Sequence, residues 1–174
     1  VEWTVKNKKY GLENLALIPG TVGAGPIQNI GAYGSEIGTY IKEVTFYDFR
    51  KNKVGAFNQK DCHFSYRSSI FKEKPELFIL SVTFELNNEP KLNLSYDSLK
   101  EQISKDGLNE KNLTPIDIFN TVKKIRTRVL PNHLKQPNVG SFFKNVYLKK
   151  KELKKLELPS DIQTFEHDDI VKIS

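Results

Sequence analysis

The sequence of 174 residues contains no methionine, one cysteine and one tryptophan. Because Cys62 is alone, no disulfide can form within the chain, which is compatible with the reducing cytoplasm. No run of about 18 apolar residues is present, so no helix is expected to span a membrane. No basic and apolar signal sequence opens the chain. Cys62 and the three histidines lack metal-ligand spacing, so we expect no metal.

The chain also lacks an initiator methionine and begins Val1-Glu2-Trp3, so we expect a fragment of a longer protein. Its net charge of +6 favours anionic partners such as phosphates, an acidic sugar nucleotide or nucleic acid. Part of this charge lies in the lysine-rich run 149–155, which is typical of a solvated helix face. A nucleic-acid surface would interleave aromatic residues, and only Tyr147 adjoins the run. We therefore expect no nucleic-acid binding.

The pattern of apolar residues predicts an α+β fold with a mainly antiparallel sheet and flanking helices. The segments chosen as strands are rich in β-branched and aromatic residues. Strands and helices alternate without the regular spacing of βαβ units. The predicted strands are 41–49, 54–57, 77–86 and 142–148, and a short helix is predicted at 149–158.

A longer helix is predicted to begin at Thr114-Pro115 and to end before Pro131. Thr114 is a suitable N-cap, Pro115 suits the first helical position, and Asp117 complements the positive end of the helix. Apolar residues recur every three or four positions, and we expect this stripe to pack on the sheet. The stripe consists of Ile116, Phe119, Val122, Ile125 and Val129.

Seven of the ten glycines lie in the first forty residues. The segment 18–34 matches neither the Walker pattern nor the dinucleotide-binding pattern. Its backbone N–H groups could still hold phosphate oxygens, and its small residues at 23–25 would let a flat ring approach the main chain. Gln28 and Asn29 could bond the polar edge of such a ring. From composition alone, a tight structural turn is an equally good interpretation.

Two later segments place reactive side chains in loops. Arg67 lies between aromatic and serine residues in segment 62–72, and its planar guanidinium could stabilise developing negative charge; a surface ion pair is the alternative. Ser141 follows a glycine in segment 137–145, where it could also be an ordinary turn residue. Tyr96 could donate to a phosphate or lie half-buried at a strand end.

Three segments together resemble the UDP-N-acetylenolpyruvoylglucosamine reductases, also called UDP-N-acetylmuramate dehydrogenases. They are Gly11 to Gly34, the Tyr-Arg-x-Ser-x-Phe-Lys type segment at 66–72, and Gly-Ser-Phe-Phe-Lys-Asn at 140–145. The run 26–34 is the most specific of them. The resemblance implies the second flavin-binding subdomain of the vanillyl-alcohol oxidase/p-cresol methylhydroxylase type, plus the substrate domain region. Residues 1–110 would form part of the FAD-binding domain, and 111–174 its continuation and the start of the substrate-binding domain.

The resemblance also implies an enzyme of peptidoglycan precursor synthesis. It would be a cytoplasmic, monomeric flavoprotein that uses NADPH and FAD to reduce UDP-N-acetylglucosamine enolpyruvate to UDP-N-acetylmuramate. Arg67 would stabilise the enolate intermediate, and Ser141 would protonate the adjoining carbon as general acid. The implied cofactor contacts are Ile18, Pro19, Gly20, Gly23, Ala24, Gln28, Asn29, Gly31, Ala32 and Tyr33, and the implied substrate contacts are Tyr66, Tyr96, Arg128 and Lys144.

The sequence departs from the family pattern at two points. Asn138-Val139 stands where the family has Gly-Asn-Ala. Val129 stands where the family often has a lysine, and Arg128 could take over that lysine's contact with the substrate phosphate. The amino-terminal flavin subdomain and the carboxy-terminal catalytic glutamate are not in the sequence, so we expect weak FAD binding and little turnover from this span. Two alternatives are another flavoprotein oxidoreductase of the same fold and a non-catalytic module that binds anions or nucleic acid.

Overall fold

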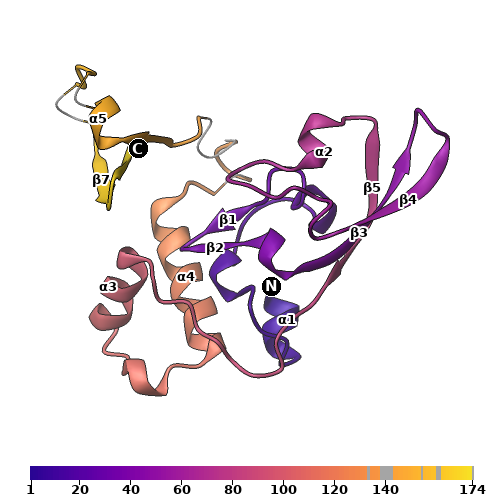
Figure 1. The fold of residues 1–174 in the computed structure, drawn as a ribbon. Helices are drawn as coiled ribbons and strands as arrows, with labels where there is room; N and C mark the ends of the chain where they lie inside the picture. The colour runs from indigo at the N-terminus through magenta and orange to yellow at the C-terminus, as the bar shows by residue number, and fades with distance from the viewer. Residues whose placement is uncertain (133, 138–142, 154, 160–161, 174) are drawn as a thin grey trace. The chain divides into compact units, whose positions relative to one another are not determined.

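A computed structural model describes residues 1–132, 134–137, 143–153, 155–159 and 162–173 (Figure 1). The chain divides into two compact units, Val1–Gln136 and Pro137–Ser174. All strand pairs among the described residues are antiparallel, and helices accompany them, which confirms the predicted α+β class. Within these ranges the strands form three small sheets. The proposed functional boundary near residue 110 is not tested by this division and stays a prediction.

The first unit contains a three-stranded sheet in the order β4-β3-β5. Side chains on its inner face, among them Val44, Phe46 and Leu77, pack with Phe71 in a hydrophobic core. The three strand predictions in this region are confirmed, including the hairpin pairing of β3 with β4. The bounds are Ile41–Asp48 for β3, Lys53–Asn58 for β4, Leu77–Phe84 for β5 and Ile70–Glu73 for helix α2, which adjoins the sheet.

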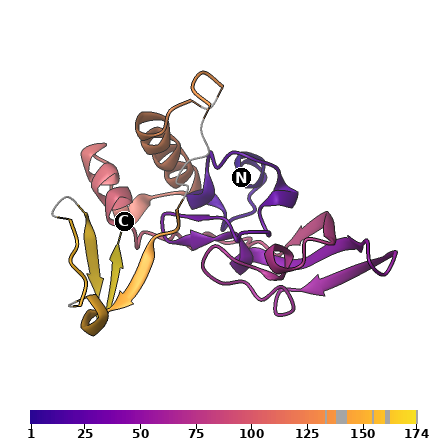
Figure 2. The same cartoon turned by 90° about the horizontal axis from the view of Figure 1, so that it is seen from above.

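The long helix α4 (Pro115–Val129) begins after the predicted N-cap Thr114, whose backbone N–H donates to Asp117 Oδ2 at 2.9 Å. It packs against α3, α1 and the 3-10 turn η1, and Figures 1 and 2 both show α3 beside it. The prediction that α4 packs on the sheet was therefore wrong, because a second core of helical side chains receives it. The bounds are Asp97–Lys105 for α3, Glu2–Lys6 for α1 and Glu13–Leu15 for η1.

The predicted stripe of α4 was also wrong at both ends. Ile116 and Val129 are 40% and 63% exposed, whereas Ile118 and Thr121 are buried. Ile116 precedes Ile118 by two positions, which is about 200° around a helix, so both cannot face one core. Because α4 packs against α3 and η1, the helix face that contains Ile118 is the buried one.

The second unit contains a three-stranded sheet in the order β6-β8-β7. Of the strand predicted at 142–148, residue 142 lies outside the described residues and residues 143–145 are not in a strand, so the predicted start was too early and the strand begins at Val146. The helix predicted at 149–158 was too long: α5 covers Lys150–Leu153, Lys149 belongs to β6, and the described residues 155–158 are not helical. The strands are β6 (Val146–Lys149), β7 (Thr164–His167) and β8 (Ile170–Ile173).

No helix in the described ranges is both long enough and apolar enough to cross a membrane. The same part of the chain contains no group of three or more His, Cys, Asp or Glu side chains that could hold a metal ion.

Candidate functional site

The glycine-rich segment forms an exposed loop whose backbone donors are available. Its short 3-10 turn η2 (Val22–Ala24) packs beside β5, and a Cβ added at Gly23 would lie 3.9 Å from the Cγ2 of Ile79. In the described part of the chain, the N–H groups of Gly20 to Gly23 donate to no protein acceptor. Gly20 has a φ of +116°, a conformation that favours glycine. Consecutive free N–H groups of this kind can hold an anion.

A tight hairpin follows this loop. Strand β1 (Gly31–Ala32) pairs with β2 (Ser35–Glu36), and the two residues between them, Tyr33 and Gly34, have φ values of +47° and +79°. Two positive φ values in a two-residue turn are typical of the type I′ hairpin. The Tyr33 side chain at its tip is partly buried against the second core.

Asn29 connects the glycine-rich segment to its neighbours. Its side chain is 1% exposed, and its Nδ2 donates to Glu36 Oε2 at 2.7 Å and to the Ser65 carbonyl at 3.1 Å. Its Oδ1 accepts from the Gly38 N–H at 2.9 Å. The side-chain amide of Asn29 is thus committed to the protein. Gln28, by contrast, is exposed.

Arg67 lies in a second tight turn. The backbones of Ser65 and Ser68 exchange two hydrogen bonds of 3.1 Å, which leaves Tyr66 and Arg67 at the tip. Arg67 has a φ of +51°, and its guanidinium lies 5.0 Å from the centre of the Tyr66 ring. A positive φ is costly for a residue with a Cβ. Surrounding contacts therefore hold this turn in place.

The arginine turn is attached to the glycine-rich segment. Arg67 Nη2 donates to the Gly31 carbonyl at 2.6 Å, and Nη1 lies 3.8 Å from Glu36 Oε1. A Cβ on Gly31 would lie only 2.7 Å from Arg67 Nη1. Ser69 Oγ adds a hydrogen bond of 2.8 Å to the Ile27 carbonyl. The predicted cofactor segment and the predicted catalytic arginine therefore form one continuous surface.

The structure also brings Tyr33 and Tyr96 together. Their rings meet edge to face with centres 5.3 Å apart. The buried Asn14 fixes this arrangement, because its Nδ2 donates to the Tyr33 carbonyl at 2.8 Å and to the Asn93 carbonyl at 3.0 Å. A predicted cofactor residue and a predicted substrate residue are therefore neighbours.

Arg126 is a candidate that the sequence analysis missed. Its Nη2 donates to the Leu17 carbonyl at 3.3 Å, and its Nε is buried without a hydrogen-bond partner in the described part of the chain. Burial lowers the pKa of Arg126, while the neighbouring Tyr33 opposes this effect. Burial likewise raises the pKa of Tyr33 against the charge of Arg126. Arg126 stands only two positions before the predicted Arg128. The sequence does not show which of the two arginines faces the tyrosines, because that depends on how the helix packs.

The remaining predicted residues are Arg128, Lys144, Ser141 and Tyr66. Arg128 is exposed in the last turn of α4, close enough for its charge to act on Tyr33. Lys144 is exposed in the second unit. Ser141 lies outside the described residues. Tyr66 is half-buried beside Arg67.

Cys62 offers no alternative chemistry. It is fully buried in the core below the arginine turn, and burial raises the pKa of its thiol to about 11. A thiol with this pKa is overwhelmingly protonated near neutral pH and is a poor nucleophile.

The geometry defines an α+β protein in which a glycine-rich loop is joined to an arginine-bearing turn. Its fold is similar to part of a solved structure, the UDP-N-acetylenolpyruvylglucosamine reductase from Thermus caldophilus, with a TM-score of 0.53. The two chains are 20% identical, and the match covers 75% of this chain and 40% of the other. No family model matches the sequence.

Curated sequences named UDP-N-acetylenolpyruvoylglucosamine reductase confirm the predicted resemblance to this family. The Buchnera aphidicola protein is 45% identical over 158 residues, which are 90% of this chain and 46% of that protein. The Polynucleobacter asymbioticus protein is 44% identical over 146 residues, with 83% and 41% covered. The Bdellovibrio bacteriovorus protein is 38% identical over 178 residues, with 100% and 52% covered. The chain thus spans about half the length of the curated relatives it matches.

Proposed function

We propose that the complete gene product reduces UDP-N-acetylglucosamine enolpyruvate to UDP-N-acetylmuramate, with FAD as cofactor and NADPH as reductant. It would act in the cytoplasm, as a monomer, in peptidoglycan precursor synthesis. The names of the relatives support this reaction. The observation that carries the proposal is the contact between the Arg67 guanidinium and the Gly31 carbonyl, because it joins a redox-cofactor loop to a charge-stabilising group.

The glycine-rich loop fits a flavin nucleotide. The free N–H groups from Gly20 to Gly23 are suited to the anionic or carbonyl oxygens of such a molecule. FAD, when bound, supplies the hydride-transfer chemistry, and the protein supplies orientation and charge. The residues proposed to hold it remain Ile18, Pro19, Gly20, Gly23, Ala24, Gln28, Asn29, Gly31, Ala32 and Tyr33.

Arg67 would stabilise negative charge on the substrate. It donates one hydrogen bond among the described residues, and a guanidinium carries five N–H donors. The remaining donors can meet an enolate and its carboxylate. Tyr66, stacked on the guanidinium, limits its movement. Ser141 would donate the proton to carbon, with Lys144 supplying positive potential.

Arg126 is proposed as the cation that faces the Tyr33–Tyr96 pair, with Arg128 as a weaker contributor from the surface. Its charge acts on the neighbouring Tyr33, and a positive charge at this place favours an anionic part of the cofactor or substrate. Arg126→Gln should therefore weaken ligand binding more than Arg128→Gln does.

The test uses the complete gene product. We expect a bound flavin, visible by its absorption, and NADPH oxidation that depends on the enolpyruvyl sugar nucleotide. Ser141→Ala should lower turnover by about 10²–10⁴-fold with the flavin still bound, which is the usual contribution of a general acid. A protein without flavin, or one that oxidises NADPH regardless of the sugar nucleotide, would remove the proposal.

A further inference from the structure

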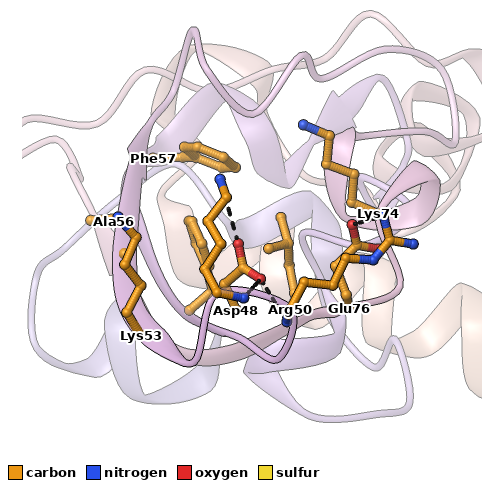
Figure 3. Close-up of a pocket in the computed structure, with 11 residues that line it drawn as sticks. Asp48, Arg50, Lys53, Ala56, Phe57, Lys74 and Glu76 are labelled. Atoms are coloured by element: carbon orange, nitrogen blue, oxygen red, sulfur yellow. Dashed lines mark hydrogen bonds and ion pairs between the residues drawn. The ribbon is translucent and has the colours of Figure 1, made fainter.

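A pocket lies beside the β3–β4 hairpin and the end of α2, apart from the candidate site (Figure 3). Its volume is about 460 Å³, within the range of pockets that hold small molecules. None of its lining residues belongs to the candidate site above. The proposed reductase chemistry gives it no role.

The floor of this pocket is aromatic. Phe46 on β3 stands opposite Gly55 on β4, and a Cβ on Gly55 would lie 2.8 Å from the Phe46 ring. Only a residue without a side chain lets the ring lie over the strand in this way. Phe57 adds a second ring, with its centre 4.5 Å from that of Phe46. Rings of this kind bind flat apolar groups through stacking and edge contacts.

The acidic groups of the pocket are already neutralised by neighbours. Asp48 Oδ1 accepts from the N–H groups of Arg50 at 2.9 Å and Lys51 at 3.0 Å. Its Oδ2 lies 3.7 Å from Lys51 Nζ. Glu76 lies 3.4 Å from Arg50 Nη1. Four of the six charges around the pocket are thus paired with each other.

Two lysines remain. Lys53 on β4 and Lys74 after α2 are exposed, and neither forms an ion pair within the described residues (Figure 3). The pocket therefore has an aromatic floor and two surplus positive charges. We propose that it binds a small aromatic molecule that carries one anionic group. The ring would contact Phe46 and Phe57, and the anion would meet Lys53 or Lys74, which lie on opposite sides of the pocket (Figure 3).

Titration with 8-anilinonaphthalene-1-sulfonate tests the proposal on the complete gene product, with fluorescence as the readout. The Lys53→Gln/Lys74→Gln variant should bind this aryl sulfonate about tenfold more weakly, since two partly exposed charges are removed. The matched control, Lys42→Gln/Lys60→Gln, removes two exposed lysines outside the pocket and should bind as the wild type does. N-phenyl-1-naphthylamine, which has the same rings without the sulfonate, should not distinguish the variants.

Amide chemical shifts locate the bound probe. We expect the aryl sulfonate to shift the signals of residues 53–57 and 74–77. Equal affinities in both double variants, or shifts confined to other parts of the protein, would overturn the proposal. These measurements need neither FAD nor the sugar nucleotide, so their failure is separate from failure of the proposed reductase function.

Discussion

Substitution of Gly31 by alanine tests how the arginine turn is attached to the glycine-rich segment. The new Cβ would lie 2.7 Å from Arg67 Nη1, 2.8 Å from the Ser35 carbonyl and 3.0 Å from Glu36 Cγ. The arginine end can move away, but the Ser35 carbonyl belongs to the paired strand of the hairpin. We therefore expect the Arg67–Gly31 hydrogen bond to break and the hairpin to shift.

The magnitude follows from two contributions. A hydrogen bond to a charged group contributes about 1.5–3 kcal/mol, and the lower end applies because the Arg67 side chain is 29% exposed. Overpacking of a tight site costs about 1–3 kcal/mol. The expected loss is about 3 kcal/mol in the free energy of unfolding. For a protein of this size, the melting temperature would fall by about 6–12 °C.

A double-mutant cycle with Arg67→Ala separates the two contributions. Removal of the guanidinium should relieve part of the crowding, so the two substitutions should be coupled by about 1 kcal/mol. Gly23→Ala is the control for stability, because its new Cβ would meet nothing closer than 3.9 Å. Strict additivity within about 0.3 kcal/mol would refute the inferred contact.

Three other outcomes are expected. Asn29→Leu should lower the free energy of unfolding by about 3 kcal/mol in urea titrations, because it removes one buried and two part-buried hydrogen bonds; a loss under about 1 kcal/mol would contradict this. The backbone N–H of Lys51 holds the pKa of Asp48 below its usual 3.8, so its stabilisation is present above that pH and is lost as the pH falls through the lower folded value. Asp48→Asn should weaken this acid dependence of the melting temperature, and an unchanged pH profile would argue against it. Cys62, with its raised pKa and full burial, should react with thiol reagents at pH 8 only as fast as the protein opens; rapid modification of the folded protein would be inconsistent with its position.

The sequence predicted those elements whose signals are local. Alternating apolar residues identify β5, and the N-cap Thr114 followed by Pro115 identifies the start of α4. Helix α3 was not predicted, because its buried residues Leu99 and Ile103 form too short a stripe to stand out. The face of α4 was mispredicted because its orientation depends also on η1 and α1, which lie far earlier in the chain.

In the candidate site, too, the sequence predicted the local motifs but not the contacts between separate segments. The motifs identified Arg67 and the glycine-rich segment, but no local pattern predicts that the guanidinium bonds the Gly31 carbonyl. That contact occurs together with a positive φ at Arg67 and a hydrogen bond from Asn29 to the Ser65 carbonyl, neither of which a local pattern shows. The choice between Arg126 and Arg128 likewise depends on which side of α4 meets Leu17.

The most direct test of the account is the single-turnover rate at which the complete, pre-reduced gene product converts the enolpyruvyl sugar nucleotide. Arg67→Ala should slow this step by about 10²–10³-fold, as loss of one preorganised donor to an oxyanion does, while the flavin content stays unchanged. Lys60→Ala, an exposed lysine near the turn, should leave the rate unaltered. A rate for Arg67→Ala within about twofold of the wild type would contradict the claim that this guanidinium stabilises the reacting group.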